Sequence, residues 1–165
     1  MSLEIERRFL IKNDNWKEFI TKKIYIEQGY LSKSLDDWII RIRLTGKDFK
    51  IALKKHIKSY TSFEFEYSIP HSDGDQIMSN LTNRIKKDRY FLEIEKNFWI
   101  IDCFKEENHP LEIAEIELSK EEEDFRLPSF ISQEITGMKN YSNFSLAHNP
   151  FSKWKKNYLT THKNN

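Results

Sequence analysis

The sequence of 165 residues has one cysteine, four prolines and four glycines, and it has no hydrophobic run long enough to span a membrane. Cys103 therefore cannot form a disulfide within the chain, and the N-terminus reaches charge at Glu4 without an apolar signal core. No low-complexity tract or linker divides the chain, so we expect one domain over residues 1–165 with a polar tail at about 156–165. These absences favour a soluble, cytoplasmic protein.

An excess of one charge is also missing. The chain has 27 lysines and arginines against 26 aspartates and glutamates, which gives a net charge of +1. A protein that binds nucleic acid through its phosphates usually carries a basic field, so we expect no nucleic-acid partner. The five histidines are scattered without the spacing of a zinc site.

The sequence does contain pairs of like charges two residues apart. These pairs are Glu4 and Glu6, Arg41 and Arg43, Glu64 and Glu66, Lys87 and Arg89, and Glu115 and Glu117. Since side chains alternate between the two faces of a strand, each pair lies on one face, and apolar residues lie on the other. Like charges at this spacing repel, so the repeated pattern indicates a multivalent partner that offsets the repulsion.

The hydrophobic pattern predicts about eight strands joined mostly by short connections. We expect them at 3–11, 24–31, 38–44, 49–55, 62–69, 83–96, 97–105 and 111–118. Short helices are predicted at about 13–22, from Ser72 or Asp73, and from a capping box at Ser119, and the aromatic tail from Tyr141 is expected to dock as a helical or irregular segment. Eight antiparallel strands can close into a barrel. The predicted fold is therefore α+β: a closed eight-stranded antiparallel β-barrel with helices packed outside.

The apolar faces decide which way the charged faces point. Their large side chains are Ile5, Phe9, Ile40, Ile42, Ile51, Leu53, Phe63, Phe65, Ile116 and Leu118. So many apolar side chains need a cover of helices and loops outside the barrel, which leaves the charged faces to line a hydrated lumen. The alternative is a sheet whose outer face carries exposed ion pairs.

The opening motif Glu4-Ile5-Glu6-Arg7-Arg8 is similar to the ExExK signature of the CYTH superfamily, the triphosphate tunnel metalloenzymes. The resemblance extends from Glu4 to about Ala147. It includes residues 28–31, 41–43, 53–54, 64–67, 87–90, 102, 115–117 and 139–143. The chain departs from the signature at Arg8, where the family has lysine. A guanidinium binds phosphate through two N–H groups but does not give up a proton, so an acid role at this position is in doubt.

The resemblance implies roles for the charged residues. Substrate oxygens would be bound by Arg8, Arg41, Arg43, Lys54, Lys87, Arg89 and Lys139. Mg²⁺ or Mn²⁺ would be held by Glu4, Glu6, Asp102, Glu115 and Glu117, whose hard oxygens suit these ions. The catalytic set would be Glu4, Glu6, Arg8, Lys54 and Glu117, supported by Glu64, Glu66 and Tyr30. One metal would organise the substrate and a second would lower the pKa of the attacking water.

The first functional hypothesis is metal-dependent hydrolysis of a triphosphate. The resemblance favours inorganic triphosphate, because we find no aromatic pocket beside the charged strands that would select a base. The alternatives are an adenylate cyclase of the class IV type on the same scaffold and a non-catalytic polyphosphate-binding or nucleotide-binding module. Both acidic ends of the site are present, which favours catalysis. The chain is expected to be a monomer or a homodimer.

Overall fold

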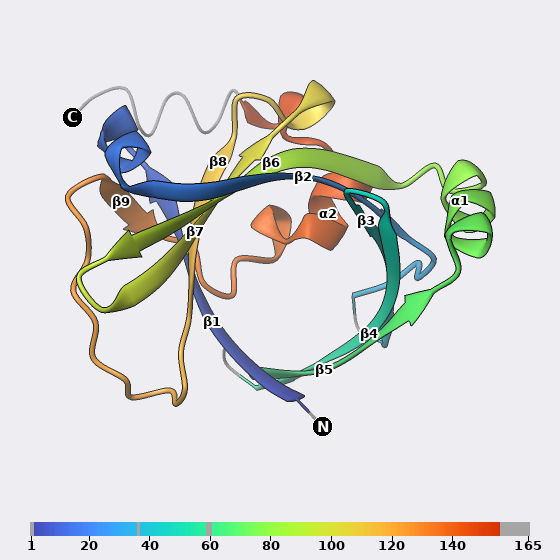
Figure 1. Cartoon of the computed structure of the whole chain (residues 1–165), viewed down its shortest axis with the longest axis horizontal. Coiled ribbons are helices and arrows are strands. Elements are labelled where there is room, and N and C mark those ends of the chain that lie inside the picture. The colour runs from blue at the N-terminus through green and yellow to red at the C-terminus, as the bar shows by residue number, and fades with distance from the viewer. Residues whose placement is uncertain (1, 36, 59–60, 156–165) are drawn as a thin grey trace.

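The protein is a β-barrel, seen here in a computed structural model that describes residues 2–35, 37–58 and 61–155 (Figure 1). Its strands are β1 (Ser2–Ile11), β2 (Ile20–Tyr30), β3 (Ile39–Thr45), β4 (Asp48–Lys58), β5 (Thr61–Ile69), β6 (Arg84–Ile94), β7 (Asn97–Phe104), β8 (Glu112–Glu117) and β9 (Ile131–Glu134). Its helices are α1 (His71–Ser79) and α2 (Asn143–His148), with 3₁₀ turns η1 (Asp14–Phe19), η2 (Glu106–Asn108), η3 (Lys139–Tyr141) and η4 (Phe151–Lys153). The predicted α+β barrel is confirmed.

The barrel closes through β1. The strand order is β5-β4-β3-β2-β6-β7-β8-β1-β9, and β5 pairs again with β1. The first half of β1 pairs with β5, and Glu6 to Leu10 pair antiparallel with β8. One strand therefore joins both edges of the sheet, and eight strands form a closed ring. The short strand β9 extends the sheet beside the end of β1.

The outer wall is apolar, as the alternation predicts. Phe9, Trp99 and Ile116 are buried in a cluster that η1 and the segment before β9 help to cover, and Trp16 of η1 packs edge-on against Tyr90. Helix α1 covers a second cluster formed with β3 and β4 (Figure 1). This cover is incomplete, because Ile40, Leu53, Phe63 and Phe65 remain partly exposed on the outer face of β3–β5.

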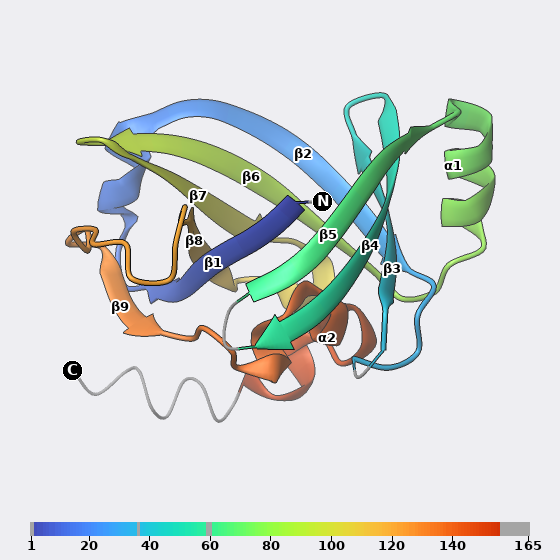
Figure 2. The ribbon, with the colours of Figure 1, turned by 90° about the horizontal axis from the view of Figure 1, so that it is seen from below.

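Helix α2 takes a different place from α1. It lies across one end of the barrel, within the ring of strands in Figure 1 and at the lower rim in Figure 2. Phe144 and Leu146 of α2 pack there against apolar side chains that share the lumen face of their strands with the ionic residues. These strand residues are Leu10, Tyr30, Ile85, Phe104 and Ile113. The predicted docking of the tail is confirmed, but α2 closes an end of the bore and does not pack on the outer wall.

One prediction about the segment after β8 is wrong, and one strand there was missed. No helix begins at Ser119, because the Glu123 carboxylate accepts hydrogen bonds from the backbone N–H and hydroxyl of Ser119, which forms a turn. The hydroxyl therefore acts as a donor and does not cap a helix. Strand β9 was missed because only Ile131 in this short segment is buried. The second strand also begins earlier than predicted, at Ile20.

The predicted polar tail at 156–165 lies outside the described residues. In the described part of the chain, no helix combines the length and the apolar character needed to cross a membrane.

Candidate active site

The ionic side chains converge inside the barrel in three groups. The first group surrounds Lys54 of β4. Its ammonium contacts Glu4 directly and lies 3.8 Å from both Glu6 and Glu64. Burial alone would lower the pKa of Lys54, but Glu6 and Glu4 raise it above its ordinary value. Burial and the neighbouring Glu6 carboxylate raise the pKa of Glu4 to about 7, so negative charge is in excess here.

The second group is built on Asp102 of β7, which has no exposed surface. Arg89 donates two hydrogen bonds of 2.7 Å to its carboxylate, and the fully buried ammonium of Lys87 lies 2.5 Å from Oδ2. Glu115 extends the group by binding Arg89 at 3.1 Å and Arg8 at 3.0 Å. Burial lowers the pKa of Lys87 to about 8. It would raise the pKa of Asp102, but Arg89 and Lys87 hold that pKa well below its usual range.

The third group joins β3, β4 and β5. Arg41 contacts Glu64 at 2.7 Å and Glu66 at 3.4 Å, and Glu66 also binds Lys50 at 2.8 Å and lies 3.8 Å from Arg43. Burial, with the adjacent Arg41, lowers the pKa of Arg43 to about 10. Glu64 and Glu66 therefore hold the arginines in place, while positive charge remains in excess around Arg43.

Three buried guanidinium N–H groups of these ionic groups have no hydrogen-bond partner in the described residues. They are Nη2 of Arg8, Nε of Arg41 and Nε of Arg43. The other side of Arg8 is fixed, since Nε binds Glu115 and Nη1 donates to the carbonyl oxygen of Tyr141. Buried donors without partners are costly, so these groups indicate a polar ligand with acceptor oxygens.

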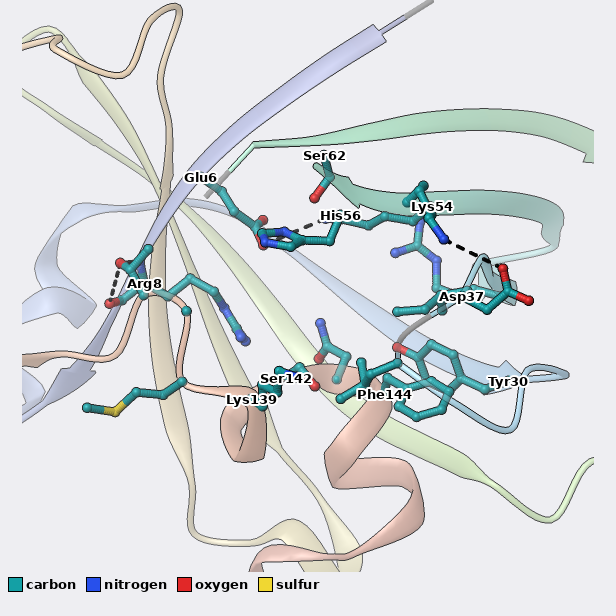
Figure 3. Close-up of a pocket in the computed structure, with 18 residues that line it drawn as sticks. Glu6, Arg8, Tyr30, Asp37, Lys54, His56, Ser62, Lys139, Ser142 and Phe144 are labelled. Atoms are coloured by element: carbon teal, nitrogen blue, oxygen red, sulfur yellow. Dashed lines mark hydrogen bonds and ion pairs between the residues drawn. The ribbon is translucent and has the colours of Figure 1, made fainter. Parts of the chain in front are cut away.

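A cavity of about 430 Å³ opens among these residues (Figure 3). Six residues of the predicted site line it, namely Glu6, Arg8, Tyr30, Arg41, Lys54 and Lys139. Among the described residues, Lys87, Arg89, Asp102 and Glu115 are not part of this lining, and their contacts place them in the ionic groups behind it. Arg43 is not part of it either, but it shares the lumen face of β3 with Arg41. Four further predicted residues of the described chain, Glu4, Glu64, Glu66 and Glu117, do not line the cavity either.

The prediction that no aromatic pocket accompanies the charged strands is wrong. Tyr30 and Phe144 both line the cavity and contact each other edge to face at 5.4 Å, beside Leu35 and Ile39. The hydroxyl of Tyr30 accepts a 2.5 Å hydrogen bond from Gln28. Phe144 belongs to the tail, which is expected to dock, but the sequence alone does not show that it docks beside Tyr30.

The cavity also contains residues that sequence reasoning did not select. His56 and Ser62 lie on the lumen faces of β4 and β5, and Thr136, Ser142 and Asn143 come from the chain around η3 and α2. The two strand residues follow the alternation of Lys54 and Glu64, which could have revealed them. Ser142 and Asn143 lie in the stretch 139–143 that carries the family resemblance, but no charge marks them.

The acidic residues at one mouth have the chemistry of a magnesium or manganese site. Glu6 lies directly opposite Glu117 in the β1–β8 register, so both carboxylates share the lumen face, and Glu4 follows two residues away. Within the described chain, no three acidic, histidine or cysteine side chains already form a group able to hold a metal ion. The hard oxygen donors and the raised pKa of Glu4 nevertheless fit a divalent cation, which would relieve the repulsion between Glu4 and Glu6.

A closed antiparallel barrel with basic and acidic groups inside its bore is the triphosphate tunnel architecture of the CYTH superfamily. The chain is 33% identical over 157 residues to an inorganic triphosphatase from Acetivibrio thermocellus, covering 94% of this chain and 99% of that protein. It is 26% identical over 148 residues to an inorganic triphosphatase from Nitrosomonas europaea, covering 87% and 96%. This chain belongs to the family of bacterial inorganic triphosphatases within that superfamily.

The structural comparison agrees. The solved inorganic triphosphatase NE1496 matches with a TM-score of 0.66 and 27% identity, over 89% of this chain and 95% of that one. A Hippeastrum protein, described as an adenylyl cyclase with a dominant triphosphatase activity, matches with a TM-score of 0.55 and 13% identity over 73% and 80%. That likeness shows the shared fold alone. No protein-family model matches the chain.

Proposed function

We propose that this protein hydrolyses inorganic triphosphate to diphosphate and orthophosphate inside the barrel, with Mg²⁺ or Mn²⁺. Water attacks a terminal phosphorus, the bond from that phosphorus to the bridging oxygen breaks, and the water loses its proton. The observation that carries the proposal is the set of buried, unpartnered N–H groups of Arg8, Arg41 and Arg43. A triphosphate supplies the acceptor oxygens and negative charge that these groups lack. Membership of the inorganic triphosphatase family supports this substrate.

The basic residues position the phosphates and neutralise their charge, which is the main work of a protein in phosphoryl transfer. Arg8 and Arg41 bind oxygens through guanidinium N–H groups whose other sides are fixed by ion pairs. Because these groups are held before substrate arrives, little reorganisation is needed in the transition state. Arg8 binds phosphate and neutralises its charge but does not act as an acid, since a guanidinium keeps its proton. Lys54 is also held charged, by Glu4 and Glu6.

We assign the metal to Glu4, Glu6 and Glu117. When bound, the cation would neutralise phosphate charge and provide a water with a lowered pKa. In the structure, Glu4 is bound by Lys54, so Lys54 is free to turn toward phosphate once Glu4 has another cation to bind. Asp102 and Glu115 hold Lys87, Arg89 and Arg8, and we assign them to positioning those bases, which narrows the five predicted metal ligands to three.

The test is to incubate purified protein with inorganic triphosphate, ATP or thiamine triphosphate in the presence of Mg²⁺, Mn²⁺ or a chelator. Orthophosphate and diphosphate from inorganic triphosphate, lost with the chelator, would support the proposal. Cyclic AMP from ATP would favour the cyclase, and tight binding of triphosphate without turnover would favour a binding module. Glu117→Gln should abolish turnover while leaving the fold intact, because its carboxylate makes no contact in the ionic groups described above.

A further inference from the structure

Asn143 stands where the ionic part of the bore meets its apolar end. It is the first residue of α2, it is half-buried, and it lines the cavity with Arg8 and Ser142. Beyond it, Phe144 and Leu146 enter the cluster that closes the bore. An anion held by the basic residues would therefore meet Asn143 as the last polar side chain before the apolar end.

The amide of Asn143 has a fixed orientation. The Lys87 ammonium lies 3.1 Å from its Oδ1. An ammonium only donates hydrogen bonds, and Lys87 is fully buried, so the amide oxygen must face the lysine. The NH₂ group then points away from Lys87. Among the described residues, the bond from Lys87 is the one hydrogen bond recorded for the Asn143 side chain. Arg8, which also lines the cavity, has an unpartnered donor in Nη2.

Arg8 and Asn143 thus both line the cavity, and each has a donor for which the described residues provide no hydrogen-bond acceptor. Arg8 is anchored by Glu115 and by the carbonyl of Tyr141, two residues before Asn143 in the same segment. The segment that carries Asn143 is thus held in register with Arg8 by a hydrogen bond. Ser142 adds no donor, because its hydroxyl donates to Ser145 and accepts from the Ser145 backbone.

We propose that Asn143 is a further substrate-binding residue, whose side-chain NH₂ donates to an oxygen of the phosphate nearest α2. The proposal rests on the triphosphatase function proposed above and deepens it. Lys87 and Asp102 act behind Asn143 and fix the direction of its amide. In the proposed substrate this is an unsubstituted terminal phosphate.

A purely structural role makes a different prediction. If Asn143 only satisfied Lys87 or anchored α2, any side chain with an oxygen facing Lys87 would serve. Asn143→Asp separates the two roles, since aspartate has nearly the same size and keeps an oxygen for Lys87, but it replaces the donor to the cavity with a negatively charged acceptor. Asn140→Asp is the matched control, because Asn140 lies in the same segment, is exposed, and does not line the cavity.

The experiment measures KM and kcat for inorganic triphosphate, the Kd of triphosphate without metal, and the melting temperature. For Asn143→Asp we expect KM and Kd to rise by about tenfold or more, with the melting temperature unchanged or higher. Asn143→Ala should give a smaller rise, because it removes the donor without adding charge. Asn140→Asp should behave like the wild type.

Equal KM and Kd for Asn143→Asp and Asn140→Asp, with an active wild type, would overturn the role of Asn143 and leave the proposed function intact. A wild type that neither binds nor hydrolyses triphosphate would overturn both. If Asn143→Asp loses its fold, Asn143→Ala decides: a KM equal to that of the wild type would also overturn the role.

Discussion

Replacing Asp102 by asparagine should destabilise the barrel strongly, because this carboxylate neutralises two buried cations. Asp102 and Lys87 have no exposed side-chain surface, and Arg89 is 13% exposed. Asn keeps the shape of the side chain but removes the charge, so Lys87 and Arg89 would face each other with Glu115 as the remaining carboxylate. Removing one partner of a buried ion pair typically costs about 3–5 kcal/mol. In a domain of this size that corresponds to a fall of roughly 6–20 °C in melting temperature.

The assay is thermal and urea unfolding of Asp102→Asn beside a matched control, Asp88→Asn. Asp88 lies on the neighbouring strand and also binds two lysines, Lys23 at 3.0 Å and Lys105 at 2.8 Å, but it does so on the outer face of the barrel. Ion pairs at the surface contribute about 0–1 kcal/mol, so this control should unfold close to the wild type. A loss of stability in Asp102→Asn no larger than that of the control would refute the reasoning.

The wild type and the Asp102→Asn variant also give a prediction for the dependence of stability on pH. Burial already lowers the pKa of Lys87 to about 8, and the loss of Asp102 would lower it further. Below pH 8 the wild type therefore holds a proton on Lys87 that the folded variant binds less tightly. By linkage, the difference in unfolding free energy should grow as the pH falls below about 8 and level off above it. A difference that increases toward pH 9 would contradict this assignment.

Four further substitutions test the site and the fold. Glu6→Gln should abolish turnover with the fold retained, whereas Arg43→Ala should mainly raise KM; unchanged rates in the carboxylate variant would remove the metal assignment. The pKa of Glu4 is raised to about 7, which means that folding disfavours its charged form. Glu4→Gln should therefore raise the melting temperature above pH 7, and this gain should disappear toward pH 4.5. A gain that is the same at both pH values would be inconsistent with this. Gly74→Ala should cost about 1–3 kcal/mol in a urea titration, since the added Cβ would lie 2.2 Å from Cγ of Phe49; a stabilised variant would show that α1 shifts easily.

The sequence predicted the barrel and its ionic interior because both follow from a period of two residues. Glu64 and Glu66 share a face whatever the neighbouring strand is, and cross-strand pairing then brings them to Arg41 and Arg43. The partners within each group were not predictable in the same way. Glu4 lies next to Lys54 only because β1 and β5 close the ring, and that contact depends on the register of the whole sheet.

The apolar strand residues that the docked tail covers were missed, although the same alternation contains them. Leu10 follows Arg8 by two residues, and Phe104 follows Asp102 by two; Ile85 precedes Lys87 by two, and Ile113 precedes Glu115 by two. Each of these apolar side chains therefore shares the lumen face with an ionic one, and all of them meet at the end where α2 docks. The prediction that ionic side chains point inward is correct for the middle of the bore. When the alternation is followed for two more residues on each of four strands, it predicts an apolar end of the bore that needs a cover. The aromatic tail has the residues to provide that cover. We therefore expect the contacts at this end, and not only the number of cations, to help determine how many phosphates fit.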